Sequence, residues 1–140
     1  MFDNAFVRTK STIPIMEFLQ SNGYKTENIA ANVISIQKGE EFPVYVNIDG
    51  NVLFFEVDLG NISEISSQEL YFELLSLNTE ILPVSVGIDT TETGDPRLVL
   101  VESREIDNLD DNEMLSVFDA FELAIDKVEC ILATYLKKVK

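Results

Sequence analysis

Apolar residues in the middle of the chain recur first at helical spacing and then at strand spacing. Steps of four, three and four place residues on one face of a helix. The residues concerned are Leu70, Leu74, Leu77 and Ile81. Ser66 and Glu69 have the spacing of a capping box, which predicts that this helix begins at Ser66, and Pro83 prevents the helix from continuing. The residues after the proline alternate between apolar and polar or small, as in a half-buried strand: Val84, Ser85, Val86, Gly87, Ile88 and Asp89.

Three strands with alternating apolar residues precede this helix. Their inward-facing residues are Ile34 and Ile36, then Phe42, Val44 and Val46, and then Leu53, Phe55 and Val57. The Asp-Gly dipeptide at 49–50 indicates a two-residue type I′ hairpin, which pairs Val46 with Leu53. A three-residue connection before it pairs Ile36 with Val44, because a four-residue loop would turn polar side chains inward.

A long helix closes the chain. Asp110 and Glu113 form a second capping box and predict its start. Apolar residues then alternate at steps of four and three for more than three heptads: Met114, Phe118, Phe121, Ile125, Val128, Leu132, Tyr135 and Val139. This seam either packs wholly on the sheet of its own chain or also meets a second copy. The number of apolar residues favours the second reading, a homodimer, which is the commonest symmetric oligomer.

The order of these elements predicts an α+β fold. A first helix has Ile15, Phe18 and Leu19 facing inward, and residues 24–32 are predicted to form a loop. The order is then α-β-β-β-α-β-β-α, which indicates a twisted antiparallel sheet packed with helices. Since no repeat or linker interrupts it, we expect one domain over residues 1–140, with 1–11 as a loose N-terminal arm.

The acidic charge limits the classes of partner. The chain has 25 acidic and 10 basic residues and a formal net charge of −15. Between Gly39 and Pro96 there are twelve acidic residues and no Lys or Arg. Such a surface repels nucleic-acid phosphates and anionic lipid, and it favours a basic protein partner. The alternative is that the acidity only maintains solubility. Without a signal peptide or a membrane-spanning stretch, the chain is expected to be cytoplasmic.

Candidate catalytic residues are few. The chain has no His, which removes the Ser-His-Asp triad and imidazole metal ligands. The best acidic cluster, Asp89, Glu92 and Asp95, does not have the spacing of an EF-hand loop and is interpreted as a solvated hairpin loop. No Gly-rich loop precedes a helix as a phosphate site requires. We therefore expect no catalytic residue, no metal and no cofactor.

Four residues are candidates for contact with a partner: Tyr45, Phe54, Glu56 and Asn78. Phe54 and Glu56 lie on the strand face opposite Leu53, and Tyr45 shares that face on the neighbouring strand, so they would form an exposed patch. The alternative is that a helix covers Phe54 and Tyr45. Asn78 lies near the apolar face of the 66–82 helix. Its amide either satisfies backbone groups where the helix gives way to the strand or contacts a partner.

The helix-to-strand passage resembles a known fold. Leu74-Leu75-Ser76-Leu77-Asn78, followed by Leu82-Pro83 and the strand to Asp89, is similar to the L-L-x-x-N helix and strand of the type III secretion chaperone-like fold, including its YbjN-like cytoplasmic relatives. The order of elements, the length and the acidity are similar as well, from about residue 12 onward. This resemblance implies a homodimer that holds an extended or partly folded protein segment on apolar patches, without cofactor or catalysis.

The functional prediction is a non-enzymatic cytoplasmic protein-binding module, with a regulatory role as one form of that function. Its partner would be a protein that is basic or partly unfolded. One alternative is an acidic mimic of nucleic acid that inhibits a basic protein. A second alternative is a metal-dependent enzyme that uses carboxylates alone.

Overall fold

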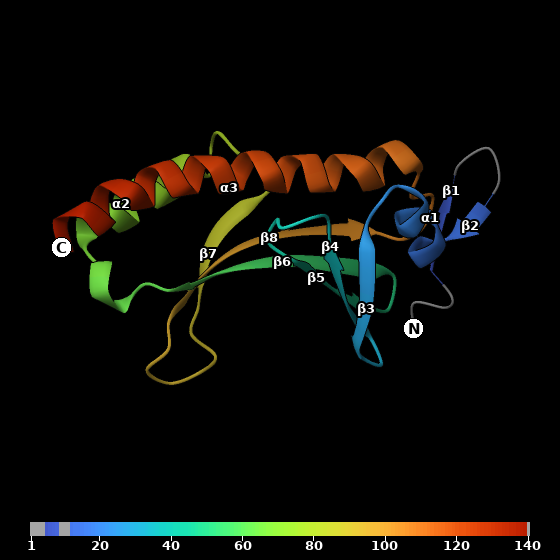
Figure 1. Ribbon diagram of the computed structural model, residues 1–140, viewed down its shortest axis with the longest axis horizontal. Helices are drawn as coiled ribbons and strands as arrows, with labels where there is room; N and C mark the ends of the chain where they lie inside the picture. Colours follow the sequence, from blue (N-terminus) through green and yellow to red (C-terminus); the bar gives the residue numbers. More distant parts are fainter. Residues whose placement is uncertain (1–4, 9–11, 140) are drawn as a thin grey trace. The chain divides into compact units, whose positions relative to one another are not determined.

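The structure is a computed structural model that describes residues 5–8 and 12–139 (Figure 1). It falls into two compact units, and each is described by itself. Unit 1 consists of the described residues up to Val57 together with Glu102–Val117, and unit 2 consists of Asp58–Val101 together with the described residues from Phe118 onward. The sequence predicts a single domain over residues 1–140.

Unit 1 begins with a small two-stranded sheet beside the first helix (Figure 1). Strand β1 (Phe6–Arg8) pairs antiparallel with β2 (Thr12–Pro14), and helix α1 (Ile15–Ser21) follows directly. Ala5 and Val7 are fully buried. The chain at residues 5–8 is therefore not the loose arm that the sequence predicts, while the rest of that predicted arm, 1–4 and 9–11, lies outside the described residues. Helix α1 buries its predicted inward face, Ile15, Phe18 and Leu19.

A six-stranded sheet with the strand order β3-β4-β5-β6-β8-β7 forms the framework of the fold. Its strands in unit 1 are β3 (Lys25–Ala30), β4 (Val33–Gln37), β5 (Val44–Asp49) and the first part of β6 (Val52–Asn61). Strand β3 occupies the region predicted as a loop. Five of its six residues are exposed, so hydrophobic alternation, the main signal for a strand, is missing there.

The hairpins of unit 1 confirm one predicted register and correct the other. Ile36 lies opposite Val44, as predicted. In the next hairpin Val46 pairs with Phe55 rather than with Leu53, because the turn is formed by 50–51 and Gly50 takes the positive φ of +59°. The shift is by two residues, and a shift of two leaves every side chain on its predicted face. Phe42, predicted to face inward, instead precedes β5 and is 41% exposed.

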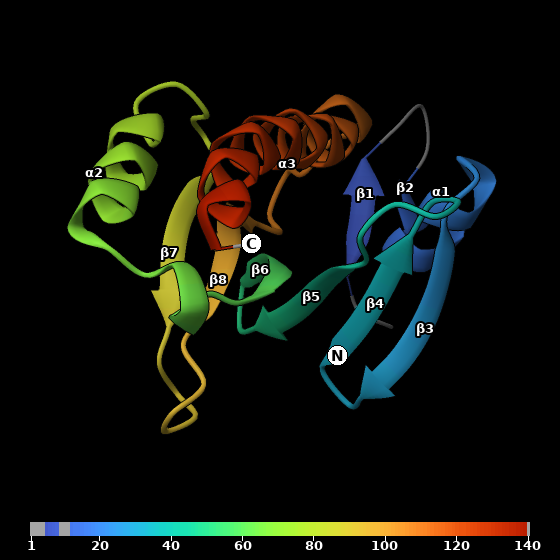
Figure 2. The same ribbon diagram turned by 60° about the vertical axis from the view of Figure 1, so that its left-hand side comes forward.

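Unit 2 contains helix α2 (Gln68–Leu77), the edge strand β7 (Ser85–Asp89) and most of β8 (Arg97–Glu105), as Figure 2 shows. Ser67, rather than the predicted Ser66, caps α2, and its side chain accepts a hydrogen bond from the Leu70 amide at 3.0 Å. The predicted apolar face of α2 is buried, including Ile81 just beyond its end. Helix α2 ends six residues before Pro83, so the proline does not terminate it.

Helix α3 (Asp111–Val139) begins where the capping box predicts. The Asp110 carboxylate accepts a hydrogen bond from the Glu113 amide at 2.8 Å. Most residues of the predicted seam are buried, and Ile125 and Leu132 are half-buried. The side chain of Val139 lies outside the described residues. The predicted α+β class with an antiparallel sheet is confirmed, with β1, β2 and β3 as additional strands.

Candidate functional site

The first candidate surface is the outer face of β4, β5 and β6 in unit 1, opposite the face that carries the buried residues. The pairings place Ser35 opposite Tyr45, and Tyr45 opposite Glu56. Phe54 lies opposite Asn47 in the adjacent row. We call Tyr45, Phe54 and Glu56 the outer-face patch. The structure thus brings three of the four predicted site residues together on two neighbouring strands.

The aromatic side chains of the outer-face patch are exposed. Tyr45 is 37% exposed, Phe54 is 45% exposed and Glu56 is half-buried. The residues on either side of Phe54 point the opposite way, and both Leu53 and Phe55 are at most 1% exposed. The alternative in which a helix covers Tyr45 and Phe54 is therefore wrong. An exposed pair of aromatic side chains on a sheet face is typical of a protein interaction site.

Asn78, the fourth predicted site residue, has a structural role at the edge of the sheet in unit 2. Its Oδ1 accepts a hydrogen bond from the Val86 amide at 2.6 Å, and its Nδ2 donates to the Val86 carbonyl at 3.5 Å. This confirms the first of the two readings, in which the amide satisfies backbone groups between helix and strand. Asn78 is not part of the outer-face patch, which lies in unit 1.

An apolar groove lies between α2 and β7 in unit 2. It has a volume of about 360 Å³ and is lined by Tyr71, Leu74, Leu75, Val86, Gly87 and Ile88. Figure 2 shows the two elements beside each other. Leu75 is 67% exposed, and Phe72 on the same helix is 72% exposed. We call this the α2–β7 groove. Sequence reasoning did not identify it, because Leu75 lies outside the stripe that predicts the buried face of α2.

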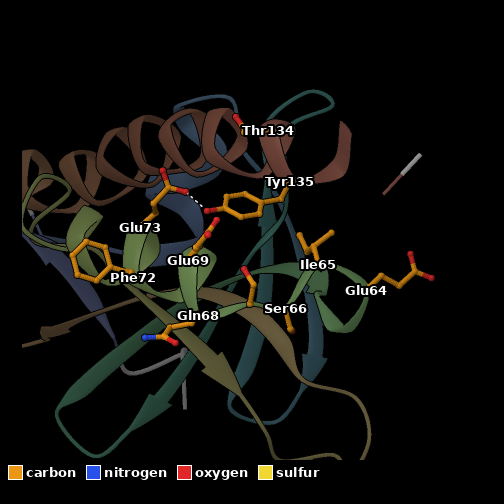
Figure 3. A pocket seen from close by; sticks show the side chains of 10 residues that line it. Glu64, Ile65, Ser66, Gln68, Glu69, Phe72, Glu73, Thr134 and Tyr135 are labelled. Carbon is orange, nitrogen blue, oxygen red and sulfur yellow. Dashed lines mark hydrogen bonds between the residues drawn. The ribbon is translucent and has the colours of Figure 1, made fainter. Parts of the chain in front are cut away.

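A second hollow in unit 2, of about 950 Å³, lies at the start of α2 (Figure 3). Tyr135 of α3 donates a hydrogen bond to the Glu73 carboxylate of α2, and Glu69 also points toward the Tyr135 ring. The hydrogen bond to Glu73 is the main cause that raises the pKa of Tyr135 to about 12, with burial and the charge of Glu69 as further causes. The phenol stays protonated at neutral pH, and its hydrogen bond to Glu73 connects α3 to α2.

A buried carboxylate on β8 in unit 1 is the strongest electrostatic feature that sequence reasoning missed. Only 2% of the Glu102 side chain is exposed. Its Oε1 lies 2.7 Å from Nη2 of Arg104, and Nε of Arg104 also donates to it. Among the described residues, Oε2 of Glu102 is buried without a hydrogen-bond partner. Burial raises the pKa of Glu102, and the charge and hydrogen bond of Arg104 oppose that rise.

The acidic hairpin loop of unit 2 is held by hydrogen bonds within the chain. Asp89 accepts bonds from the amide and hydroxyl of Thr91, which lower its pKa. Asp95 lies 3.4 Å from Nη1 of Arg97 and accepts a hydrogen bond from Asn61. In the described part of the chain, no group of three His, Cys, Asp or Glu residues is placed to hold a metal ion. None of the helices between residues 5 and 139 that the structure describes is long and apolar enough to cross a membrane.

Two solved structures of type III secretion proteins have this fold. SpcU in its heterodimeric complex with ExoU from Pseudomonas aeruginosa gives a TM-score of 0.68 at 18% identity, over 84% of this chain and 96% of the other. SycH from Yersinia pestis, in complex with a fragment of YscM2, gives a TM-score of 0.56 at 17% identity, over 84% and 95%. YbjN from E. coli is similar at a TM-score of 0.47 and 12% identity, over 86% and 84%.

The sequence itself carries the signature of a family. The comparison with curated protein sequences gave no match. The sequence model of the family CesT_Tir_1 matches residues 9–138, which is nearly the whole chain. The chain belongs to this family, CesT_Tir_1, a family of type III secretion chaperones.

Proposed function

We propose that the protein is a non-enzymatic cytoplasmic chaperone-type module that holds a segment of a protein partner on the outer-face patch. The observation that carries the proposal is the exposure of Tyr45 and Phe54 on a sheet face whose opposite side is buried. SpcU and SycH, which share the fold, were both solved in complexes with another protein. These complexes support a protein partner, and the outer-face patch is our own assignment for this chain.

The chemistry of the outer-face patch defines the kind of partner. The aromatic rings of Tyr45 and Phe54 would be covered by apolar side chains of the partner, which releases water from both surfaces. The absence of any Lys or Arg between Gly39 and Pro96 favours a partner segment with Lys or Arg next to its apolar residues. Such a segment is accessible when the partner is extended or partly unfolded.

Replacing both aromatic residues tests the proposal. We expect the double variant Tyr45→Ser/Phe54→Ser to stay folded, because both side chains are exposed. We expect it to lose at least about tenfold in affinity, since aromatic residues at the centre of an interface often contribute 2 kcal/mol or more. The measurement is affinity capture from the native cell followed by mass spectrometry, and then titration of the identified partner.

Phe42→Ser is the matched control, since Phe42 lies in the same unit and is similarly exposed, at 41%. It should retain the partner. The outer-face patch is wrong if the double variant binds as wild type does, or if it unfolds. Capture at low and high salt separates the alternatives: binding through apolar contacts persists at moderate salt, whereas a nucleic-acid mimic would release its basic partner.

We further propose that the protein forms a homodimer, as the sequence leads us to expect, but not through the α3 seam. The seam residues are mostly buried within the chain and are not available to a second copy. The two exposed apolar side chains of α2 are instead available: Phe72 is 72% exposed, and Leu75, which lines the α2–β7 groove, is 67% exposed. Symmetric packing of α2 against α2 of a second copy would cover these side chains.

Leu75→Ser is therefore expected to shift the dimer toward monomer by at least about tenfold in dissociation constant. Leu136→Ser, an exposed leucine on α3, should leave the dimer unchanged. Sedimentation equilibrium measures both effects. A wild-type protein that stays monomeric at millimolar concentration would contradict the dimer and leave the outer-face patch untouched.

A further inference from the structure

Strand β7 lies at one edge of the six-stranded sheet, and in the described part of the chain no strand pairs with its outer side. An edge strand presents backbone N–H and C=O groups that can pair with another chain. In an antiparallel ladder, both groups of one residue point to the same side, and successive residues alternate between the two sides. The direction of the groups on one residue of β7 therefore gives the direction for all of them.

The hydrogen bonds of Asn78 reveal that direction. Both the N–H and the C=O of Val86 bond to the Asn78 side chain, so they point away from β8. By the alternation, those of Ser85, Gly87 and Asp89 point toward β8, and those of Ile88 point outward again. The outward groups of β7 thus belong to Val86 and Ile88, and those of Val86 are already bonded to Asn78.

The sequence of β7 is compatible with antiparallel pairing to a second copy. If two β7 strands met with Gly87 at the twofold axis, Val86 of one copy would lie opposite Ile88 of the other. Because both residues have outward groups, each such pair would exchange two hydrogen bonds. Ser85 would lie opposite Asp89, so no like charges would face each other. Both hydrogen-bonded pairs need the backbone groups of Val86, one from each copy.

Helix α2 is held beside this edge. Helix α2 and β7 together line the α2–β7 groove, and the Val84 amide donates to the Ile81 carbonyl at 3.0 Å within the connection. Asn78 directly follows α2 and is the residue whose side chain joins the end of the helix to the edge itself. Loss of its amide would free the groups of Val86 and release the end of α2.

We propose that the two hydrogen bonds between the Asn78 side chain and Val86 keep the β7 edge from pairing with another strand, and we call these two bonds the Asn78 clasp. Without the clasp, β7 pairs with β7 of a second copy. This pairing differs from the homodimer proposed above, which uses side chains of α2. The sealed edge leaves the α2–β7 groove as the exposed apolar surface beside β7.

The test compares Asn78→Ala with wild type. We expect Asn78→Ala to reach a higher mass than wild type at the same concentration in sedimentation equilibrium, with at least tenfold tighter association and a new infrared band of intermolecular strand pairing. Val86→Pro in the Asn78→Ala background should remove this extra association, because proline has no N–H to donate. Asn78→Asp should associate more than wild type but less than Asn78→Ala, since its carboxylate still accepts the Val86 N–H but cannot donate to the Val86 C=O.

Two outcomes would overturn the proposal. One is a folded Asn78→Ala protein with the mass of wild type. The other is extra association that survives Val86→Pro but disappears with Leu75→Ser, which would assign it to the proposed α2 dimer instead. If Asn78→Ala does not fold, hydrogen exchange of wild type decides: the Val86 amide should exchange at least tenfold more slowly than the Ile88 amide, and equal rates would refute the clasp.

Discussion

Arg104→Ala is expected to destabilise the protein by about 2–3 kcal/mol at pH 7, because it leaves the Glu102 carboxylate buried without a partner. Removing one member of a buried ion pair typically costs about 3–5 kcal/mol. Glu102 can escape part of that cost by binding a proton. From its ordinary pKa of 4.5, protonation at pH 7 costs about 1.36 × 2.5, or about 3.4 kcal/mol, which sets an upper bound on the electrostatic part.

The pH dependence of the loss follows from the sign of the pKa shift. Burial raises the pKa of Glu102 above its unfolded value, so the folded state binds this proton more tightly than the unfolded state does. The favourable contribution of the Glu102 proton to the free energy of unfolding is then fully present below about pH 4.5 and is lost as the pH rises through the folded pKa. Without Arg104 that pKa rises further. The destabilisation by Arg104→Ala should therefore shrink to below about 1 kcal/mol near pH 4.5.

Denaturant unfolding of Arg104→Ala at several pH values measures both effects. Arg97→Ala is the matched control on the same strand, since Arg97 pairs with the half-exposed Asp58 at 3.0 Å and should contribute only about 1 kcal/mol or less. Glu102→Gln in the Arg104→Ala background should restore most of the lost stability. The interpretation fails if Arg104→Ala costs no more than Arg97→Ala, or if its cost is the same at pH 4.5 and pH 7.

The elements predicted correctly from the sequence are those with strong periodicity or a specific cap. Helix α3 begins at its predicted capping box because one Asp side chain and one backbone amide decide that position. The faces of β5 and β6 are right even though their register is not, since a slip of two residues preserves the side-chain alternation. Strand β3 has no such pattern. Strand β3 is stabilised by its antiparallel pairing with β4, and no pattern in the sequence indicates that pairing.

The candidate site shows a similar division. The alternation of side chains along β6 was enough to place Phe54 and Glu56 on the face opposite Phe55. Whether Phe54 and Glu56 are exposed depends on what covers that face, which the alternation does not show. Glu102 was missed because an acidic residue in a strand is normally solvated, and only the structure shows 2% exposure of its side chain. Asn78 could be noticed from its place beside apolar residues, whereas its two bonds to Val86 depend on how the chain returns after α2.

Phe55→Ala is expected to destabilise the protein by about 3–5 kcal/mol, whereas Phe54→Ala should cost no more than about 1 kcal/mol. The two residues are adjacent on β6 and identical in type, so backbone effects and side-chain size cancel in the comparison. Phe55 is 1% exposed, and its removal would leave a cavity that the packed interior cannot close. Phe54 is 45% exposed and already contacts water in the folded protein.

Chemical denaturation followed by far-ultraviolet circular dichroism gives both free energies of unfolding, and equal slopes with denaturant ensure that the values are comparable. The contrast between the two variants also bears on function. A stability cost for Phe54→Ala close to that for Phe55→Ala would mean that Phe54 is packed inside the fold, and the outer-face patch could not hold a partner. A small cost, together with weaker partner binding by the same variant, would separate the residue that stabilises the sheet from the residue that contacts the partner.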